Sequence, residues 1–184
     1  MASPSRAGLL DELRDYVPAD AREAAMRDRL VAFVGAHPDA FERTSTIGHV
    51  TASAWIVDPS RTRALLMHHR KLGKWLQPGG HVDGNPDVRA AALREAGEEC
   101  GLASLRFAAP GIYDVDVHRI PGRPGEPEHD HYDLRFALEA DPAEPLVVNA
   151  ESNRLAWVAL DALAAYGVDE SVLRLARKTA ALAP

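Results

Sequence analysis

The chain has 184 residues, of which 46% are hydrophobic and 26% are charged, a composition typical of a soluble globular protein with one domain and a sizeable core. Its formal net charge of −6 at pH 7 argues against a nucleic acid or an anionic membrane surface as a partner. The single cysteine, Cys100, permits no disulfide within the chain, and no apolar run is long enough to span a bilayer, so we expect a cytoplasmic protein.

Two short helices are predicted in the first 45 residues. Residues 9–13 are rich in leucine and precede Pro18, before which a first helix would end. Asp20 can accept hydrogen bonds as the N-cap of a second helix, which Pro38 would end. We expect residues 1–45 to form a helical extension packed on the core. A homodimer contact or a lid remains the alternative.

A β-hairpin is predicted next. Residues 50–57 alternate in polarity and residues 64–67 are apolar, so both segments favour strands. Asp58 and Pro59 between them are typical turn residues. The two strands should therefore pair directly.

The loop after this hairpin carries candidate substrate-binding residues. Arg70 and Lys74 come just before a glycine-rich stretch, where either cation could meet a phosphate, although such a charged run is usually a solvated loop. Trp75 could stack on a base, as could Tyr132 in a later strand, although core packing is the commoner role of such rings. We therefore predict Arg70, Lys74, Trp75 and Tyr132 as substrate contacts.

A helix of about three to four turns is predicted after the glycine-rich stretch. Asn85 is a good N-cap, and Pro86 suits the first helical position because its missing N–H would be unpaired there anyway. No proline interrupts the alanine-rich residues 88–100, and Gly101 supplies a C-terminal stop.

Three carboxylates lie on one face of this helix. Glu95, Glu98 and Glu99 are spaced i, i+3 and i+4, whereas Ala96 and Cys100 would share a buried face. A hard divalent cation would relieve the repulsion between the carboxylates, so the cluster indicates a site for Mg²⁺ or Mn²⁺. For this spacing taken alone, a solvated acidic face is the ordinary alternative.

The second half of the chain predicts further strands and a last helix. Residues 112–118 and residues 131–138 alternate in polarity, as strands do. Residues 170–182 show apolar positions at helical spacing. Mixed strands with helices before, between and after them indicate an α/β protein.

One of these strands also carries candidate zinc ligands. His129, His131 and Asp133 would share the face opposite to the apolar one. Such a set is more often a polar face or a surface that contacts substrate. The oxygen ligands of the preceding helix are the better metal candidates.

The whole pattern around that helix resembles the Nudix box, in which a glycine, five residues, a glutamate and seven residues precede R-E-U-x-E-E-x-G-U, with U a bulky aliphatic residue. The residues that match are Gly80, Arg94, Glu95, Glu98, Glu99, Gly101 and Leu102. Pro86 stands where the first glutamate belongs, and Ala96 is a small residue at a U position. Residues 75–80 and 154–160 also resemble segments of this MutT-like family, and the likeness covers most of the chain from about Gly48 onward.

The resemblance implies an α/β Nudix fold over residues 46–184, with a mixed β-sheet sandwiched between α-helices. It implies an enzyme that uses Mg²⁺ or Mn²⁺ to hydrolyse the diphosphate linkage of a nucleoside diphosphate derivative or a similar small molecule. By the same resemblance, the metal ligands are Glu98 and Glu99, assisted by Glu95, the Gly79 carbonyl and Glu151 in a later loop. Glu95 is either a ligand or the general base, and Arg94 orients the glutamates.

The departure at Pro86 leaves alternatives open. Asp83 or Asp87 could supply the missing charge; without it, Arg94 would be less well anchored and metal affinity would fall. The alternative function is a catalytically weak or inactive Nudix module that binds a nucleotide or a partner protein. Isomerase relatives on this fold use a catalytic cysteine and an additional glutamate, and the only cysteine here lies in the box helix.

Overall fold

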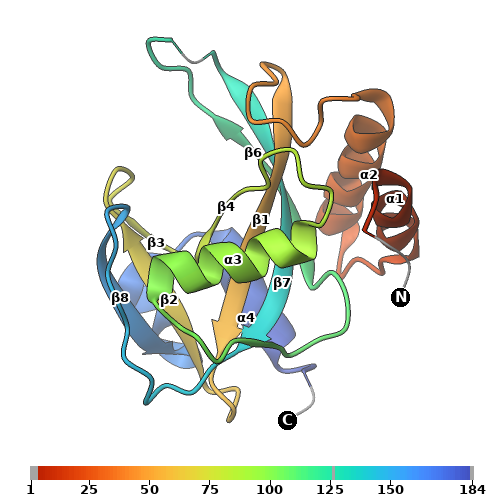
Figure 1. Cartoon of the computed structure of the whole chain (residues 1–184). Coiled ribbons are helices and arrows are strands. Elements are labelled where there is room, and N and C mark those ends of the chain that lie inside the picture. Colours follow the sequence, from red (N-terminus) through yellow and green to blue (C-terminus); the bar gives the residue numbers. More distant parts are fainter. Residues whose placement is uncertain (1–3, 126, 183–184) are drawn as a thin grey trace.

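The computed structural model describes residues 4–125 and 127–182 (Figure 1). Within these residues, one mixed sheet is flanked by helices on both faces. The strands are β1 (Gly48–Val57), β2 (Arg63–His69), β3 (Lys74–Leu76), β4 (Gly79–His81), β5 (Arg106–Phe107), β6 (Asp114–Ile120), β7 (His129–Glu139) and β8 (Ser152–Ala159). The helices are α1 (Arg6–Asp15), α2 (Ala21–Ala36), α3 (Val88–Cys100), the 3₁₀ helix η1 (Leu160–Tyr166) and α4 (Glu170–Thr179). The predicted α/β architecture is confirmed.

The centre of the sheet is a parallel pair, β1 and β7, which runs in register from Gly48 opposite Asp130 to Val57 opposite Glu139. The other pairings are antiparallel, including β1 with β2, so the predicted hairpin is confirmed. Its turn is closed by Asp58, whose carboxylate accepts hydrogen bonds from the backbone N–H groups that follow the turn. Strand β4 pairs with β1, and strand β6 pairs with β7.

Alternation along β1 sends its side chains to two different helical layers. Ala54 packs with Ala96 and Cys100 of α3, so the predicted buried face of that helix is confirmed. Trp55 points the other way, and its indole N–H donates to Thr179 of α4 at 2.8 Å. The sheet is therefore covered by α3 on one face and by α4 on the other (Figure 1).

The N-terminal helices pack against the α3 side of the sheet. Ser5 and Asp20 cap α1 and α2, the second as predicted. Leu13 and Leu30 from these helices are fully buried in the same apolar cluster as Val50 of β1. The two helices thus share a core with the strands.

The start of α3 differs from the prediction. Asp87 is the N-cap, with its carboxylate accepting from the N–H of Ala90, and the helix begins at Val88. Asn85 instead accepts a hydrogen bond from the N–H of Asp87, so Pro86 lies before the helix. The cause is local: Asn85 closes a turn of its own, which leaves the next side chain to cap the helix. At the other end, Gly101 adopts the left-handed conformation with φ 72°, as predicted.

Strand β6 also starts later than predicted, at Asp114. Tyr113 precedes it, and its hydroxyl donates to the carbonyl of Leu175 on α4, whereas Val115 lies in the cluster on the α1 and α2 side. Strict alternation over residues 112–118 would place Tyr113 and Val115 on one face, but the structure places them on different faces. The predicted last helix is confirmed as α4, with Val172 and Leu175 on its buried side, although it ends at Thr179 rather than at residue 182. Among the helices of the described chain, none is long and apolar enough to cross a membrane.

Candidate active site

Two glycines fit tightly between β1 and α3. Gly79 pairs with Ser53 of β1, and a Cβ at Gly79 would lie 2.7 Å from the Ser53 Cα. A Cβ at Gly80 would lie 2.6 Å from a carboxylate oxygen of Glu95. Glycine is required at Gly79 because the backbone of Ser53 leaves no room for a side chain, whereas a side chain at Gly80 would displace the Glu95 carboxylate. The glycine pair therefore lies directly beside the carboxylates of α3.

Glu99 is the most buried of the three carboxylates, with 3% of its surface exposed. The N–H of Gly79 donates to its Oε2 at 2.8 Å. Burial raises the pKa of Glu99 to about 7; the Gly79 hydrogen bond opposes this shift, while the charges of Glu95, Glu151 and Glu98 add to it. Glu99 thus lies in a field of negative charge that a cation would relieve.

Arg94 connects the other two carboxylates to β4. Its Nη1 lies 2.8 Å from Oε1 of Glu95 and 3.4 Å from Oε2 of Glu98. Its Nη2 donates to the carbonyl of His81 at 2.9 Å. Burial raises the pKa of Glu95 despite this guanidinium. Arg94 therefore fixes the carboxylates relative to the glycine strand by charge-assisted hydrogen bonds.

Glu151 reaches the same region from the loop before β8. Its carbonyl accepts from the N–H of Arg70, and its N–H donates to Asn149. The amide of Asn149 in turn donates to the carbonyl of Glu98 on α3 at 3.4 Å. The charge of Glu151 raises the pKa of Glu99, so the two carboxylates interact. The loop thus brings a fourth acid to the three on the helix.

This donor set fits a hard divalent cation. The available ligand atoms are carboxylate and backbone oxygens, which Mg²⁺ and Mn²⁺ prefer. The missing Cβ of Gly80 leaves space beside Glu95, and burial, with the charges of the neighbouring acids, raises the pKa of Glu99. Glu95, Glu98, Glu99 and Glu151, with the Gly79 carbonyl, are the groups that could hold such an ion.

The structure also shows how the region around Pro86 is arranged. Asp83 lies 3.8 Å from Arg43 in an exposed ion pair, and Asp87 caps α3. These two acids thus have other partners, and Arg94 is held by His81 and its neighbouring glutamates instead. Arg94 is anchored although Pro86 replaces the expected glutamate.

Three of the four predicted substrate contacts lie on or near the β2–β3 hairpin. Arg70 is exposed and donates to the carbonyl of Ser152, and Lys74 is exposed at the start of β3. Trp75 is half-buried, and its ring makes an edge contact with Tyr166 at 5.2 Å. Tyr132 lies elsewhere: it is buried and stacks on Phe33 of α2 with ring centroids 4.0 Å apart. The structure therefore does not bring Tyr132 together with the other three.

The residues that cluster at the predicted zinc face differ from those predicted. Asp133 accepts hydrogen bonds from Thr51, Ser53 and Arg135, whereas His49 joins His129 and His131. Sequence reasoning missed His49. The signal was its position two residues before Thr51, on the polar side of the alternating strand β1.

Two rings of this histidine face, His49 and His131, are poor proton acceptors. Burial, together with the charges of neighbouring histidines, lowers the pKa of His49 to about 4 and that of His131 to about 2. Both rings are therefore neutral at pH 7.

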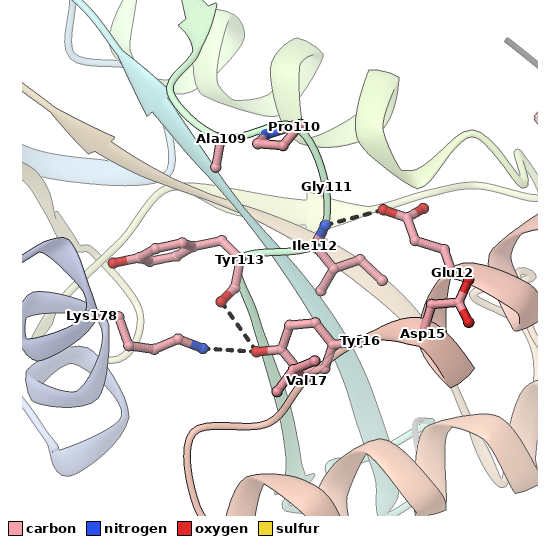
Figure 2. Close-up of a pocket in the computed structure, with 10 residues that line it drawn as sticks. All are labelled: Glu12, Asp15, Tyr16, Val17, Ala109, Pro110, Gly111, Ile112, Tyr113 and Lys178. Carbon is pink, nitrogen blue, oxygen red and sulfur yellow. Dashed lines mark hydrogen bonds between the residues drawn. The ribbon is translucent and has the colours of Figure 1, made fainter. Parts of the chain in front are cut away.

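A separate groove of about 450 Å³ lies between α1 and the segment before β6 (Figure 2). Its lining includes Tyr16, Ile112 and Lys178, and Lys178 donates to the hydroxyl of Tyr16 at 2.7 Å. None of the α3 carboxylates lines it, so the groove is distinct from the candidate active site.

Comparison with known proteins identifies the family. A model of the NUDIX domain matches residues 48–177. Over 109 residues the chain is 32% identical to "Putative 8-oxo-dGTP diphosphatase 3" of Mycobacterium tuberculosis, a match that covers 55% of this chain and 46% of that protein. The chain thus spans about half the length of the curated relatives it matches.

Solved structures share the fold. The MutT NUDIX hydrolase of Burkholderia pseudomallei matches with a TM-score of 0.55 and 27% identity, covering 71% of this chain and 97% of that one. The Nudix hydrolase RenU of M. smegmatis matches with a TM-score of 0.57 and 24% identity, covering 74% of this chain and 89% of that one. The family model covers more than half of this chain and includes the glycine strand and the carboxylate helix. The chain therefore belongs to the NUDIX family.

Proposed function

We propose that this chain is a divalent-metal-dependent pyrophosphohydrolase that cleaves the diphosphate linkage of a nucleoside diphosphate derivative or a similar small molecule. The observation that carries the proposal is the environment of Glu99, a buried carboxylate with a pKa near 7, surrounded by three other acids and held by the Gly79 N–H. Perturbed carboxylates of this kind are typical of functional sites.

Each residue of the site has a proposed role. Glu98 and Glu99 are metal ligands, assisted by the Gly79 carbonyl and by Glu151 from its loop. Glu95 is a further ligand or the general base. Burial raises its pKa, which favours a role in proton transfer, and its carboxylate lies against Gly80.

Arg94 is a positioning residue. Its guanidinium is shared between Glu95, Glu98 and the His81 carbonyl, so it keeps the carboxylates facing the glycine strand. A bound Mg²⁺ or Mn²⁺ would neutralise the diphosphate oxygens and lower the pKa of a bound water.

The substrate is proposed at the level of chemical class. The exposed cations Arg70 and Lys74 and the ring of Trp75 are proposed contacts for phosphate and base, and Tyr132 is the weaker member of this set because it stacks on Phe33. The name of the M. tuberculosis relative makes an oxidised purine nucleoside triphosphate the first compound to test.

The organisation of the chain is proposed as well. Residues 46–184 are the hydrolase domain, and residues 1–45 are an extension whose helices pack on the sheet. We propose that the protein acts on small molecules in the cytoplasm. A homodimer formed through the N-terminal extension is the alternative to a monomer.

The test is release of phosphate-containing products from a panel of nucleoside diphosphate and triphosphate compounds, including 8-oxo-dGTP, with Mg²⁺ and separately with Mn²⁺. Glu99→Gln keeps an oxygen acceptor for the Gly79 N–H but loses the charge, so we expect kcat/KM to fall at least about 100-fold. Glu128→Gln, at an exposed carboxylate paired with Arg119, is the matched control and should keep full activity.

A wild type that binds Mg²⁺ or Mn²⁺ but turns over nothing in the panel would contradict the hydrolase. Tight nucleotide binding without turnover, unchanged in Glu99→Gln, would instead identify a binding module.

A further inference from the structure

Five of the eight histidines of the chain gather at one end of the sheet. His49 is the second residue of β1 and lies in register with His131 of β7, so the two side chains project from the same face. Their ring centroids are 4.7 Å apart. His129, two residues earlier on β7, lies 5.0 Å from His49 and 5.2 Å from His131. His118 of β6 adds a ring 5.5 Å from His131.

A further ring comes from the glycine strand. His81 follows Gly80 on β4, and its ring centroid lies 4.9 Å from that of His49 and 5.5 Å from that of His131. Its carbonyl is the group that accepts from Arg94. His81 therefore connects the two regions: its backbone contacts the carboxylate site, and its ring lies among the histidines.

The nitrogens of three of these rings have the spacing of a metal site. One ring nitrogen from each of His49, His129 and His131 lies within 4.8 Å of the others. Zinc binds imidazole nitrogen at about 2.0–2.1 Å, so ligand nitrogens in a tetrahedral site are about 3.4 Å apart. Small rotations of the rings would bring the three nitrogens to that distance. The ring of His81, beside those of His49 and His131, is a candidate for a fourth position.

Two features independent of the spacing point to a ligand. His49 is 98% buried, since only 2% of its surface is exposed, and neither of its ring nitrogens finds a hydrogen-bond partner of regular geometry among the described residues. A buried imidazole without well-formed hydrogen bonds is costly, and coordination would relieve that cost.

The second feature is the orientation of His129. Its Nδ1 lies 2.9 Å from the carbonyl of Pro127, which can only accept, so Nδ1 carries the proton and Nε2 carries the lone pair. A backbone carbonyl that holds the second ring nitrogen in this way is the usual support for a metal-binding histidine.

The ligand type selects the ion. Neutral imidazoles suit zinc and neighbouring first-row transition metals, whereas Mg²⁺ and Mn²⁺ prefer oxygen. We propose that His49, His129 and His131, with His81, form a second metal site that binds a zinc-type divalent cation and joins the ends of β1, β4 and β7. This site differs in chemistry from the carboxylate site on α3 and does not depend on the proposed hydrolysis.

The test uses the full chain, free of any affinity tag, stripped of metal with a chelator and then dialysed. Zn²⁺ is titrated calorimetrically in excess Mg²⁺, which occupies oxygen sites, and Co²⁺ is added in a parallel sample. We expect one equivalent of Zn²⁺ to bind and Co²⁺ to give the intense visible absorption of tetrahedral nitrogen coordination.

The variants separate the two sites. His131→Gln should weaken Zn²⁺ binding at least about 100-fold, and His49→Gln should do the same. His37→Gln, at the C-cap of α2 and outside the cluster, and Glu99→Gln should bind Zn²⁺ as the wild type does. If the buried His49→Gln variant fails to fold by circular dichroism, His131→Gln carries the test, because His131 is only half-buried.

Equal Zn²⁺ affinity in wild type and His131→Gln would overturn the proposal, as would a wild type that binds no Zn²⁺ in excess Mg²⁺. Failure of the proposed hydrolysis is a separate result, seen as absent turnover in the substrate panel while Zn²⁺ still binds.

Discussion

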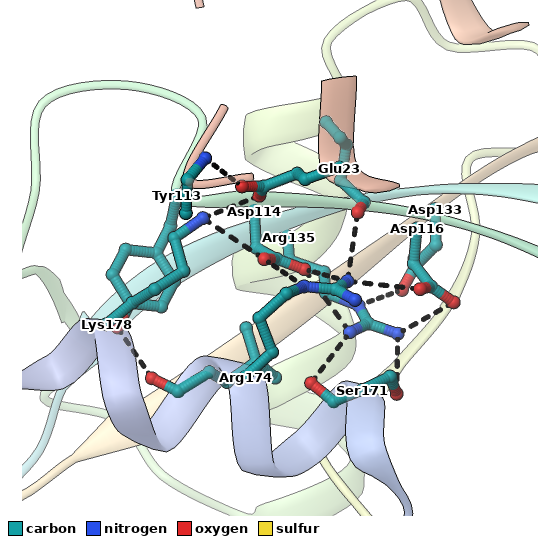
Figure 3. A network of polar contacts seen from close by, with 12 residues as sticks. Glu23, Tyr113, Asp114, Asp116, Asp133, Arg135, Ser171, Arg174 and Lys178 are labelled. Atoms are coloured by element: carbon teal, nitrogen blue, oxygen red, sulfur yellow. Dashed lines mark hydrogen bonds and ion pairs between the residues drawn. The ribbon is translucent and has the colours of Figure 1, made fainter. Parts of the chain in front are cut away.

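Arg174 of α4 spans the carboxylate of Asp114 on β6 with two hydrogen bonds, from Nε to Oδ1 at 2.9 Å and from Nη2 to Oδ2 at 2.7 Å (Figure 3). Both side chains are buried. The same guanidinium reaches Asp116 at 3.1 Å, and Lys178 lies 3.1 Å from Asp114. This network holds α4 against β6. Without Arg174 and Lys178, the carboxylates of Asp114 and Asp116 would be buried with fewer partners.

Removing the cation from this pair should destabilise the protein. Arg174→Met leaves Asp114 and Asp116 buried with fewer partners, so we expect the free energy of unfolding to fall by about 3–5 kcal/mol. Arg177→Met, at an exposed arginine of the same helix paired with Glu170, is the control and should change it by less than about 1 kcal/mol. Urea unfolding monitored by circular dichroism measures both, and equal losses would contradict the role of the network.

The same carboxylate predicts the response to acid. Burial opposes the charge of Asp114, but Arg174, Arg135 and Lys178 outweigh it and hold its pKa below the ordinary value of 3.8. Because the folded pKa lies below the unfolded one, this stabilisation is present above about pH 4 and is lost as the pH falls further. We expect the free energy of unfolding to drop below that pH, by about 1.4 kcal/mol per pH unit for each proton taken up.

The check is unfolding at a series of pH values. Asp114→Asn should be less stable at pH 7 and show a shallower decline below pH 4. Asp11→Asn, at an exposed acid of α1, should follow the wild type. A decline that is equally steep in Asp114→Asn would assign the acid sensitivity to other groups.

The two glycines of β4 should respond differently to the same added methyl group. At Gly79 the obstacle includes backbone atoms of Ser53 and Ala52, so Gly79→Ala should cost about 1–3 kcal/mol of stability. At Gly80 the obstacle is the end of the Glu95 side chain, which can move. Gly80→Ala should therefore keep the fold and lower kcat/KM at least about 10-fold. Thermal unfolding and enzyme kinetics of both variants test this prediction. A loss of stability in Gly80→Ala with little loss in Gly79→Ala would contradict it.

Arg94 should act on catalysis through the glutamates it holds. We expect Arg94→Met to lower kcat/KM about 10- to 100-fold, and Arg94→Lys to restore only part of the loss because an ammonium lacks the planar fork of the guanidinium. Arg89→Lys, on the same helix with its guanidinium over Phe107, is the matched control for activity. Full activity in Arg94→Met would mean that the glutamates position themselves.

Local chemistry made α3 predictable. The spacing of Glu95, Glu98 and Glu99, the alanine-rich core of the helix and the stop at Gly101 all depend on residues within about one turn of each other. The predicted N-cap was wrong for an equally local reason. Asn85 and Asp87 can both accept backbone hydrogen bonds, and the turn between them decides which one caps the helix. Residues close in sequence were therefore enough to predict the helix and its end, but they misplaced its N-cap by two residues.

The sequence by itself determined the alternating strands, the carboxylate helix and, through the spacing of the box, the family. Only the tertiary structure decided which distant groups interact: Glu151 with Glu99 through its charge, Arg174 with Asp114 by hydrogen bonds, and His49 rather than Asp133 with His131. The reason is that periodicity and capping act over a few residues, whereas the parallel pairing of β1 with β7 and the docking of α4 depend on how the whole chain buries its apolar faces.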